Sequence, residues 1–514
     1  MRLPTSALTG YVVLSIALWP VPLLNVLHVE SAAVIAFAAF FVAGLSAISR
    51  FKDGASVPAV LAEQGGALLV PLAALTISRL WAPNCAYATG LGMYVLFPGI
   101  TCVLAVAGAY ALTGGNRLRR RAPWVLGAAG VAVAVAGPVY DLGFHPQFYT
   151  YNHVFGGVLG PIYDEQLAFR PGLFVYRGLT LLWAGVLFGW GHWRRQEGGI
   201  WQEGRPRQGD GVRREGPRSS LAALAVGLCG FGIMGVYAFS APLGINTTPD
   251  TLQRALGGHL QTPHVDLYYD PSTVSAREAE ALARDHDAEI QRLAEEMELA
   301  EDEAPGRVQS YIYPSPDVKA RLTGARATSV SPVWLAEPQV HLLRSRVEES
   351  LSHELAHVVS RPFGLPGIRA SWAVGLVEGW AVALEAPSGR PSPHDLVAVA
   401  AATDTTAGWP EALEQRAQDL ATRLSPWGFW TGRGAVSYAT MGSFVTYLQE
   451  AYGPAPLKRV YARANFRTVY GKALPELAGE WVAFLRRRPV VSVAVHDVVT
   501  RQFARPSLFE TRCP

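Results

Sequence analysis

The first half of the chain contains seven long apolar stretches. Each is close to the ~20 consecutive apolar residues that a helix needs to cross the hydrocarbon core of a bilayer. The seven stretches cover residues 11–27, 32–48, 61–80, 91–112, 123–140, 173–190 and 221–239. Helices satisfy their own backbone hydrogen bonds, as a membrane-spanning segment must. The pattern therefore predicts an all-α polytopic membrane domain of seven spans over residues 1–241, with the lipid bilayer as its partner.

The first apolar stretch is interrupted by Pro20 and Pro22. A secretory signal peptide would end in a small-residue cleavage site and would not be followed at once by another apolar run. This stretch has no such cleavage site, and the second run follows directly. We therefore expect a retained membrane span and not a cleaved signal.

Basic side chains are concentrated in alternate loops. Arg50 and Lys52 follow the second stretch, four arginines at 117–121 follow the fourth, and seven arginines at 194–218 follow the sixth. The loops after the first, third and fifth stretches hold almost no Lys or Arg until Arg170. Because loops rich in Lys and Arg stay in the cytoplasm, the amino terminus is predicted to be cytoplasmic. With seven spans, everything after residue 239 lies outside the cytoplasm.

Two charged residues fall in the predicted membrane domain. Arg177 lies just inside the sixth stretch, and it needs an acidic partner if it faces the bundle. Asp141, at the outer end of the fifth stretch, is the nearest candidate by depth. We therefore expect a structural ion pair between Arg177 and Asp141.

The chain has four cysteines. Cys102 and Cys229 lie inside predicted spans and are expected to be buried as small apolar residues. Cys85 and Cys513 both fall on the outer side, where disulfides persist. The sequence allows a disulfide bridge between Cys85 and Cys513 but does not decide it, because it does not fix the distance between the two residues.

The composition becomes polar after residue 241. A Pro, Gly and Thr-rich linker covers 242–263, a soluble domain follows over 264–488, and 489–514 form a C-terminal tail. We expect short strands at 265–269, 308–313 and 340–343, a helix opened by the capping box at 275–278, and mainly helices after residue 385. Strands first and helices afterwards predict an α+β domain. The net charge of +3 gives no reason to expect a nucleic-acid partner.

The soluble domain contains the motif His353-Glu354-Leu355-Ala356-His357. Residues four apart on a helix share one face, so both imidazoles can reach one zinc ion and Glu354 can reach a water beside it. An apolar stripe at helical spacing lies opposite the histidines, formed by Val347, Leu351, Leu355 and Val358. The pattern predicts a helix with one face on a core and the other toward a cleft. Two polar histidines on an exposed helix are the alternative.

A catalytic zinc site needs a third protein ligand. Segment 372–385 is apolar almost all round, as a buried helix is, and it carries Glu378 in its middle. A buried carboxylate without a partner is costly, so Glu378 is expected to meet a cation. Glu385 lies seven residues further on the same face, where it can accept the second N–H of a ligating histidine. An exposed acid near the helix end is the alternative for Glu385.

These residues resemble the metal site of gluzincin metallopeptidases. More narrowly, the motif at 353–357 followed by Glu378-Gly379-Trp380-Ala381 resembles the bacterial peptidase MA-like domain, which is related to the aminopeptidase-N group. The resemblance covers roughly the last half of the chain. It implies a gluzincin-type zinc metallopeptidase domain, one Zn2+ on His353, His357 and Glu378, and a peptide or protein substrate. Together with the loop charges, it implies a bacterial inner (cell) membrane protein with a periplasmic catalytic domain.

The chain departs from the aminopeptidase pattern in two ways. The gap from His357 to Glu378 is slightly longer, and the Gly-x-Met-Glu-Asn stretch that binds a free amino terminus is missing. The metal site therefore carries over and the exopeptidase assignment does not, so we expect an endopeptidase. The resemblance also implies a tyrosine roughly sixty residues past the third ligand as the oxyanion donor. Tyr438 stands at that distance, and Tyr447 is the second candidate.

The resemblance gives one strand a role as well. In gluzincins, a strand just before the zinc helix forms the edge of the cleft, and a substrate can bind to it by strand addition. Residues 340–343 stand at this place.

Three functions remain open. The first is an outward-facing membrane zinc peptidase. The second places the site in the cytoplasm or inside the bilayer; the arginine-rich loops disfavour the cytoplasm, and Arg344, Arg346, Glu348 and Glu349 beside the motif disfavour lipid. The third is a non-enzymatic receptor, sensor or transporter with a peptidase-like binding domain. The sequence indicates neither the cleavage preference nor the oligomeric state.

Overall fold

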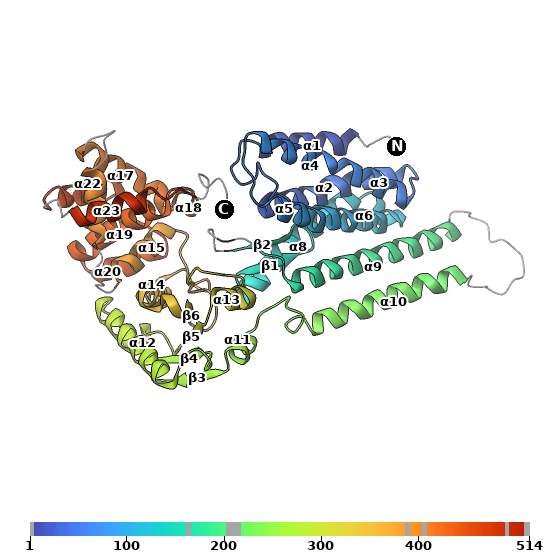
Figure 1. Ribbon diagram of the computed structural model, residues 1–514. Helices are drawn as coiled ribbons and strands as arrows, with labels where there is room; N and C mark the ends of the chain where they lie inside the picture. Colours follow the sequence, from blue (N-terminus) through green and yellow to red (C-terminus); the bar gives the residue numbers. More distant parts are fainter. Residues whose placement is uncertain are drawn as a thin grey trace, which may run out of the picture. The chain divides into compact units, whose positions relative to one another are not determined.

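The computed structural model describes residues 5–160, 165, 167–201, 217–385, 391–402, 409–488 and 493–507. Most of these residues are helical, and the strands form one hairpin and one four-stranded sheet (Figure 1). The chain forms two compact units and passes from the first to the second between Thr248 and Pro249. The long apolar helices belong to the first unit, and the sheet and the motif at 353–357 belong to the second.

Five helical segments of the first unit are long and apolar enough to cross a membrane. They are α2 (Val29–Lys52); α3 (Val57–Ala67) with α4 (Leu69–Ile77) and the turn η1 (Ser78–Leu80); α5 (Tyr87–Tyr94) with the π-helical turn η2 (Val95–Gly99) and α6 (Ile100–Thr113); α8 (Ala122–Phe144); and α9 (Pro171–Trp201). Helix α6 packs against both α2 and α9. These segments match the second to sixth predicted stretches, so by length and composition five of the seven predicted spans are candidate membrane spans.

The first and seventh predicted spans are shorter. Helix α1 (Thr5–Leu18) ends at Leu18 and not at residue 27, because Pro20 and Pro22 lack the backbone N–H groups that would continue it. Helix α10 (Pro217–Ala238) counts as an apolar helix over Ala223–Ala238, which is too short to count as a span by itself. Seven spans are therefore not established by the described residues.

A β-hairpin lies between α8 and α9. Its strands β1 (Tyr149–Asn152) and β2 (Gly156–Leu159) pair antiparallel, with the first residue of β1 opposite the last of β2. Tyr149 and Tyr151 are buried, and β1 contacts α8. A short helix, α7 (Asn116–Arg119), connects α6 to α8.

Arg177 of α9 is fully buried and binds backbone oxygens. Its guanidinium donates to the carbonyls of Leu96 (2.8 Å), Phe97 (3.2 Å) and Asn152 (2.9 Å), and to the hydroxyl of Thr101 (2.9 Å). The first two carbonyls belong to the π-helical turn η2, which contains a proline and departs from regular α-helical hydrogen bonding. The guanidinium therefore satisfies the backbone where the helix is irregular.

The predicted ion pair between Arg177 and Asp141 is wrong. The buried Asp141 carboxylate accepts hydrogen bonds from the Thr150 hydroxyl (2.7 Å) and the Asn246 side-chain amide (2.9 Å). The prediction considered only charged partners, whereas carbonyl, hydroxyl and amide groups satisfy both residues separately.

Cys85 is disulfide-bonded, whereas Cys102 and Cys229 are free. Cys513, the partner considered for Cys85 from the sequence, lies outside the described residues. Cys102 is buried within α6, as expected for a cysteine that acts as a small apolar residue.

The sheet of the second unit has the order β3-β4-β5-β6. Its strands are β3 (Gly258–Gln261), β4 (Val265–Tyr269), β5 (Val308–Tyr313) and β6 (Gln339–Leu343). The β3–β4 pair is antiparallel, and β4, β5 and β6 are parallel. Helix α12 (Ala276–Glu296) connects β4 to β5, and α13 (Pro316–Thr323) lies between β5 and β6. The predicted strands at 265–269 and 308–313 are confirmed, and that at 340–343 begins one residue earlier.

The two faces of the sheet follow the alternation of side chains along its strands. In β5, Val308 and Ile312 join the main core with α12 and α14 (Val347–Ser360). Tyr311 and Tyr313 point to the other face, where α11 (Pro249–Leu256) and α13 add their apolar residues. Helix α12 starts at Ser275, whose hydroxyl accepts the backbone N–H of Glu278, as the capping-box pattern predicts.

Two predicted boundaries differ from the structure. The expected linker at 242–263 contains α11 and β3, which belong to the second unit. The Pro and Gly residues of this segment are typical of a linker, but it contains an eight-residue helix that buries Leu252 and Leu256. The expected tail at 489–514 contains α23 (Val493–Phe503), which packs against α16 (Pro393–Ala402).

The remaining second-unit elements are helical. They are η3 (Glu301–Glu303), η4 (Arg344–Arg346), η5 (Arg361–Phe363), α15 (Val374–Ala383), α17 (Trp409–Leu424), α18 (Pro426–Thr431), α19 (Gly434–Tyr452), α20 (Pro454–Tyr461), α21 (Phe466–Tyr470) and α22 (Leu474–Leu485). The predicted order of strands first and helices afterwards is confirmed for the described residues.

We predict that Arg177→Met lowers the unfolding temperature of the detergent-solubilised protein. A buried carbonyl left without its donor costs about 1–3 kcal/mol, and Arg177 serves three carbonyls. Arg79→Met is the matched control, because Arg79 is exposed and lies over the ring of Tyr87. Equal unfolding temperatures for the two variants would show that the backbone around η2 does not depend on Arg177.

Candidate metal centre

Helix α14 presents two faces, as its sequence pattern predicts. The apolar stripe is buried in the main core and consists of Val347, Leu351, Leu355 and Val358. His353 and His357 lie on another face, one turn apart, with ring centroids separated by 4.8 Å. Packing of the apolar stripe therefore fixes the direction in which both imidazoles point.

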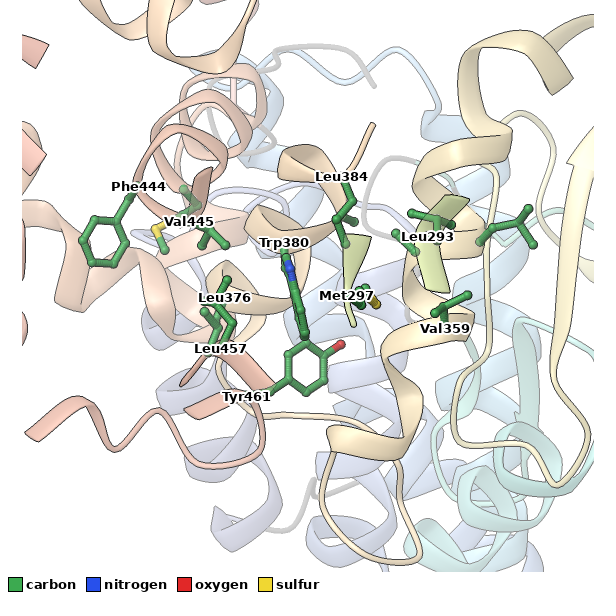
Figure 2. Packing of buried hydrophobic residues seen from close by; sticks show 14 of the residues in the cluster. Leu293, Met297, Val359, Leu376, Trp380, Leu384, Phe444, Val445, Leu457 and Tyr461 are labelled. Atoms are coloured by element: carbon green, nitrogen blue, oxygen red, sulfur yellow. The ribbon is translucent and has the colours of Figure 1, made fainter. Parts of the chain in front are cut away.

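Helix α15 carries Glu378 through the middle of the core. Its apolar residues Leu376 and Trp380 are fully buried, and Trp380 lies 5.4 Å from Tyr461 between ring centroids. Figure 2 shows Trp380 of α15 and Leu384, which follows its last residue, between two groups of neighbours: Leu293, Met297 and Val359 on one side and Phe444, Val445 and Leu457 on the other. The predicted helix at 372–385 is shorter than expected, since Trp372 is exposed and Glu385 follows the last helical turn.

The three predicted ligand atoms converge. His353 Nε2 lies 3.2 Å from His357 Nε2 and 3.2 Å from Glu378 Oε2, and His357 Nε2 lies 3.5 Å from the same oxygen. Ligand atoms ~2.0–2.1 Å from a tetrahedral zinc ion lie about 3.3–3.4 Å from one another. The triangle therefore has the size of one face of a tetrahedral zinc site. Among the described residues, this is the one group of three His, Cys, Asp or Glu side chains that could hold a metal ion.

Glu385 orients the first histidine. Its Oε1 lies 3.0 Å from His353 Nδ1. When His353 donates the Nδ1 proton to this carboxylate, the lone pair of its Nε2 points to the other two ligand atoms. This is the tautomer that a metal requires.

The electrostatics of the cluster favour a cation. Burial lowers the pKa of His353, but hydrogen bonds with Glu378 and Glu385 outweigh burial and raise this pKa well above its ordinary value. Burial raises the pKa of Glu378, but the electrostatic interaction with His357 and hydrogen bonds with both histidines bring it below the ordinary range. A carboxylate kept ionised beside two imidazoles suits a positive charge at the centre of the triangle.

Glu354 is buried beside the candidate ligands, and it is bound by a residue that the motif did not reveal. The hydroxyl of Ser331 donates to Glu354 Oε2 (2.7 Å) and lies 2.9 Å from the backbone oxygen of Glu354. Ser331 precedes Glu354 by 23 residues, so no local spacing could indicate the contact. The hydrogen bond occupies one carboxylate oxygen and leaves Oε1 available for another partner.

The segment containing Ser331 also extends the sheet. Val330 forms an antiparallel bridge with His341 of β6, through N–H···O distances of 3.3 and 3.0 Å. At His341, therefore, the outer edge of β6 is already paired within the chain. The expected cleft edge at 340–343 is covered at this position by the segment that binds Glu354.

The two tyrosine candidates lie in different surroundings. Tyr438, near the start of α19, has its ring centroid 6.1 Å from that of His353, and it packs on Phe429. Tyr447 donates a hydrogen bond to Glu480 (3.3 Å), and its ring packs on Phe484. The structure therefore brings Tyr438 next to the ligands and gives Tyr447 partners on α22.

The cluster reaches solvent on one side. The side chains of His353, His357 and Glu378 retain 15%, 10% and 16% of their surface exposed. Three ligands that are held but not fully enclosed leave room for a water or substrate oxygen at the fourth position, as catalytic zinc sites require. The arrangement therefore fits a catalytic ion better than a closed structural one.

Comparison of the chain with protein-family models, with curated proteins and with solved structures found no match. The function is therefore inferred from the site itself. Its main observations are the tetrahedral spacing of three ligand atoms, the oriented histidine and the adjacent buried carboxylate.

We predict that Gly379→Ala destabilises the protein, whereas Gly479→Ala does not. A Cβ at Gly379 would lie 2.7 Å from the backbone oxygen of Met441, so α15 would have to move away from α19. Such overpacking costs about 1–3 kcal/mol. A Cβ at Gly479 of α22 meets nothing within 4 Å, and alanine there gains up to about 1 kcal/mol of helix propensity. Thermal unfolding of both variants tests this, and a Gly379→Ala protein as stable as wild type would contradict it.

Proposed function

We propose that the second unit is a gluzincin-type zinc metallopeptidase domain that cleaves peptide bonds within a peptide or protein chain. The observation that carries this proposal is the triangle of ligand atoms, with edges of 3.2, 3.2 and 3.5 Å, formed by His353, His357 and Glu378. Zinc on three such ligands lowers the pKa of water and polarises a substrate carbonyl.

Each neighbouring residue has a role in this proposal. Glu385 holds the tautomer of His353. Glu354 accepts a proton from the attacking water and delivers it to the leaving nitrogen. Ser331 fixes Glu354 through Oε2, so that Oε1 takes the proton. Tyr438 donates a hydrogen bond to the oxyanion that develops on the substrate carbonyl.

We also propose that the protein is a multi-pass protein of the bacterial inner (cell) membrane, in which the first unit anchors the proposed peptidase domain. Arginines near the end of α9, Arg194 and Arg195, favour a cytoplasmic position for that end. Helix α10 then has to cross the bilayer to bring the second unit outside the cytoplasm. The proposed periplasmic location thus depends on α10 as a span.

We predict that Glu354→Gln binds one zinc per chain yet cleaves peptides 10²–10⁴-fold more slowly, since general-base assistance is typically worth this much. His353→Ala removes a ligand and should lose the metal. Glu348→Gln, the same substitution at an exposed position of α14, is the control and should leave both properties unchanged. Metal analysis and cleavage of a peptide library measure them.

Two outcomes of this experiment contradict the proposal. Cleavage by Glu354→Gln at the wild-type rate would remove Glu354 as the base. Zinc binding without cleavage by the wild type, across a broad library, would favour the alternative of a receptor, sensor or transporter with a peptidase-like binding domain.

We predict that a cysteine at position 302 reacts with a membrane-impermeant thiol reagent in intact cells. Asp302 is exposed on η3 in the second unit, so Asp302→Cys reports the side on which that unit lies. Asp53→Cys, at the exposed end of α2, is the control and should react only after the cells are broken. Labelling of both positions only in broken cells would place the second unit in the cytoplasm and show that α10 does not cross.

A further inference from the structure

Arg292 of α12 binds both helices that carry the proposed metal ligands. Its Nη2 donates to the hydroxyl of Ser352 in α14 (3.0 Å) and to the carbonyl of Leu384 at the end of α15 (2.6 Å). The guanidinium also pairs with two carboxylates of its own helix, Glu289 and Glu296. One side chain thus connects three helices.

The two contacts made by Arg292 lie next to functional positions. Ser352 immediately precedes His353, the first proposed ligand. Leu384 immediately precedes Glu385, which binds His353 Nδ1 at 3.0 Å. Any shift of α15 relative to α14 at this point changes the distance between Glu385 and His353. Arg292 opposes such a shift because it binds the residue before each of them.

Glu289 accepts hydrogen bonds from both Arg292 and Ser352. It binds Arg292 through both of its oxygens, and Oε1 also accepts the hydroxyl proton of Ser352 (2.5 Å). The Ser352 oxygen in turn accepts an N–H of Arg292. Burial raises the pKa of Glu289, but hydrogen bonds from Arg292 and Ser352 lower it below its ordinary value. The Ser352 hydroxyl also lies 3.3 Å from the carbonyl oxygen of Leu384, so Arg292, Glu289, Ser352 and Leu384 form one hydrogen-bonded group.

We propose that Arg292 is a positioning residue for the metal centre: with Glu289 it sets the relative position of α14 and α15, so that Glu385 orients His353 and Glu378 completes the ligand triangle. The inference rests on the proposed metal site. It adds that the geometry of the site is imposed from α12, a helix that contributes none of the proposed ligands.

Competition with a fluorescent chelator measures the zinc Kd of the full-length, detergent-solubilised protein and tests this inference. Loss of residues that orient metal ligands typically costs 10–100-fold in affinity, so the zinc Kd of Arg292→Ala should rise about 10-fold or more. Arg344→Ala is the matched control. Arg344 pairs with Glu278 at 2.7 Å, so it too joins α12 to the region before α14, but away from the ligands. Its Kd should stay within about twofold of wild type.

Thermal unfolding with and without zinc separates positioning from general support. Arg292→Ala should lose part of the stabilisation that zinc gives the wild type, because stabilisation by a bound ligand rises with the logarithm of its concentration divided by Kd. A residue with only a structural role would lower both unfolding temperatures equally. An unchanged Kd for Arg292→Ala would overturn the positioning role and leave the proposed function intact. A wild type that binds no zinc would instead overturn the proposed function.

Two milder variants carry the test if Arg292→Ala does not fold. Arg292→Lys retains the charge but cannot reach Ser352 and Leu384 with one planar group. Ser352→Ala removes the hydroxyl alone. Both should raise the zinc Kd several-fold, on the scale expected for outer ligand-orienting groups, and wild-type affinity in both would overturn the inference.

Discussion

The candidate site depends on how the charge of one largely buried carboxylate is compensated. Glu378 lies on α15, whose neighbouring side chains Leu376 and Trp380 are fully buried. A carboxylate in such surroundings is costly unless it is paired, and the imidazoles of His353 and His357 lie 3.2 and 3.5 Å from it. The sheet supports α14, which presents the histidines, and the later helices enclose α15. Most of the domain can be understood as the packing that brings these three side chains together.

The sequence predicted those parts of the site that follow local rules. The four-residue spacing of His353 and His357 and the apolar stripe opposite them defined α14 and its two faces, because helical periodicity alone decides which residues share a face. Glu378 was identified since a lone acid in an apolar helix needs a partner. Ser331 and Arg292 could not be found in this way. Their contacts with Glu354 and Ser352 join segments 23 and 60 residues apart, and no spacing rule relates such positions.

The same distinction explains the fold. Five membrane-length helices were predictable because the length of an apolar run is a local property. The span predicted at 11–27 continued past Pro20 and Pro22, whereas α1 ends before them. The predicted linker contains β3, whose stability comes from pairing with β4. The ion pair expected for Arg177 was wrong because Arg177 binds backbone carbonyls and not Asp141. Every residue carries such a carbonyl, so no sequence pattern identifies the ones that a side chain will bind.

Two constraints of different kind hold α15 in place. Near its middle, Gly379 lets the helix approach the backbone of Met441 so closely that a Cβ would lie 2.7 Å from the carbonyl oxygen. At its end, Arg292 binds the carbonyl of Leu384 from the opposite side of the core. The first constraint is steric and sets the separation from α19, whereas the second is electrostatic and sets the position against α14. A tetrahedral site tolerates only a few tenths of an ångström in its ligand distances. The proposed metal site therefore needs both constraints, and its zinc affinity would depend on the packing of four helices, α12, α14, α15 and α19.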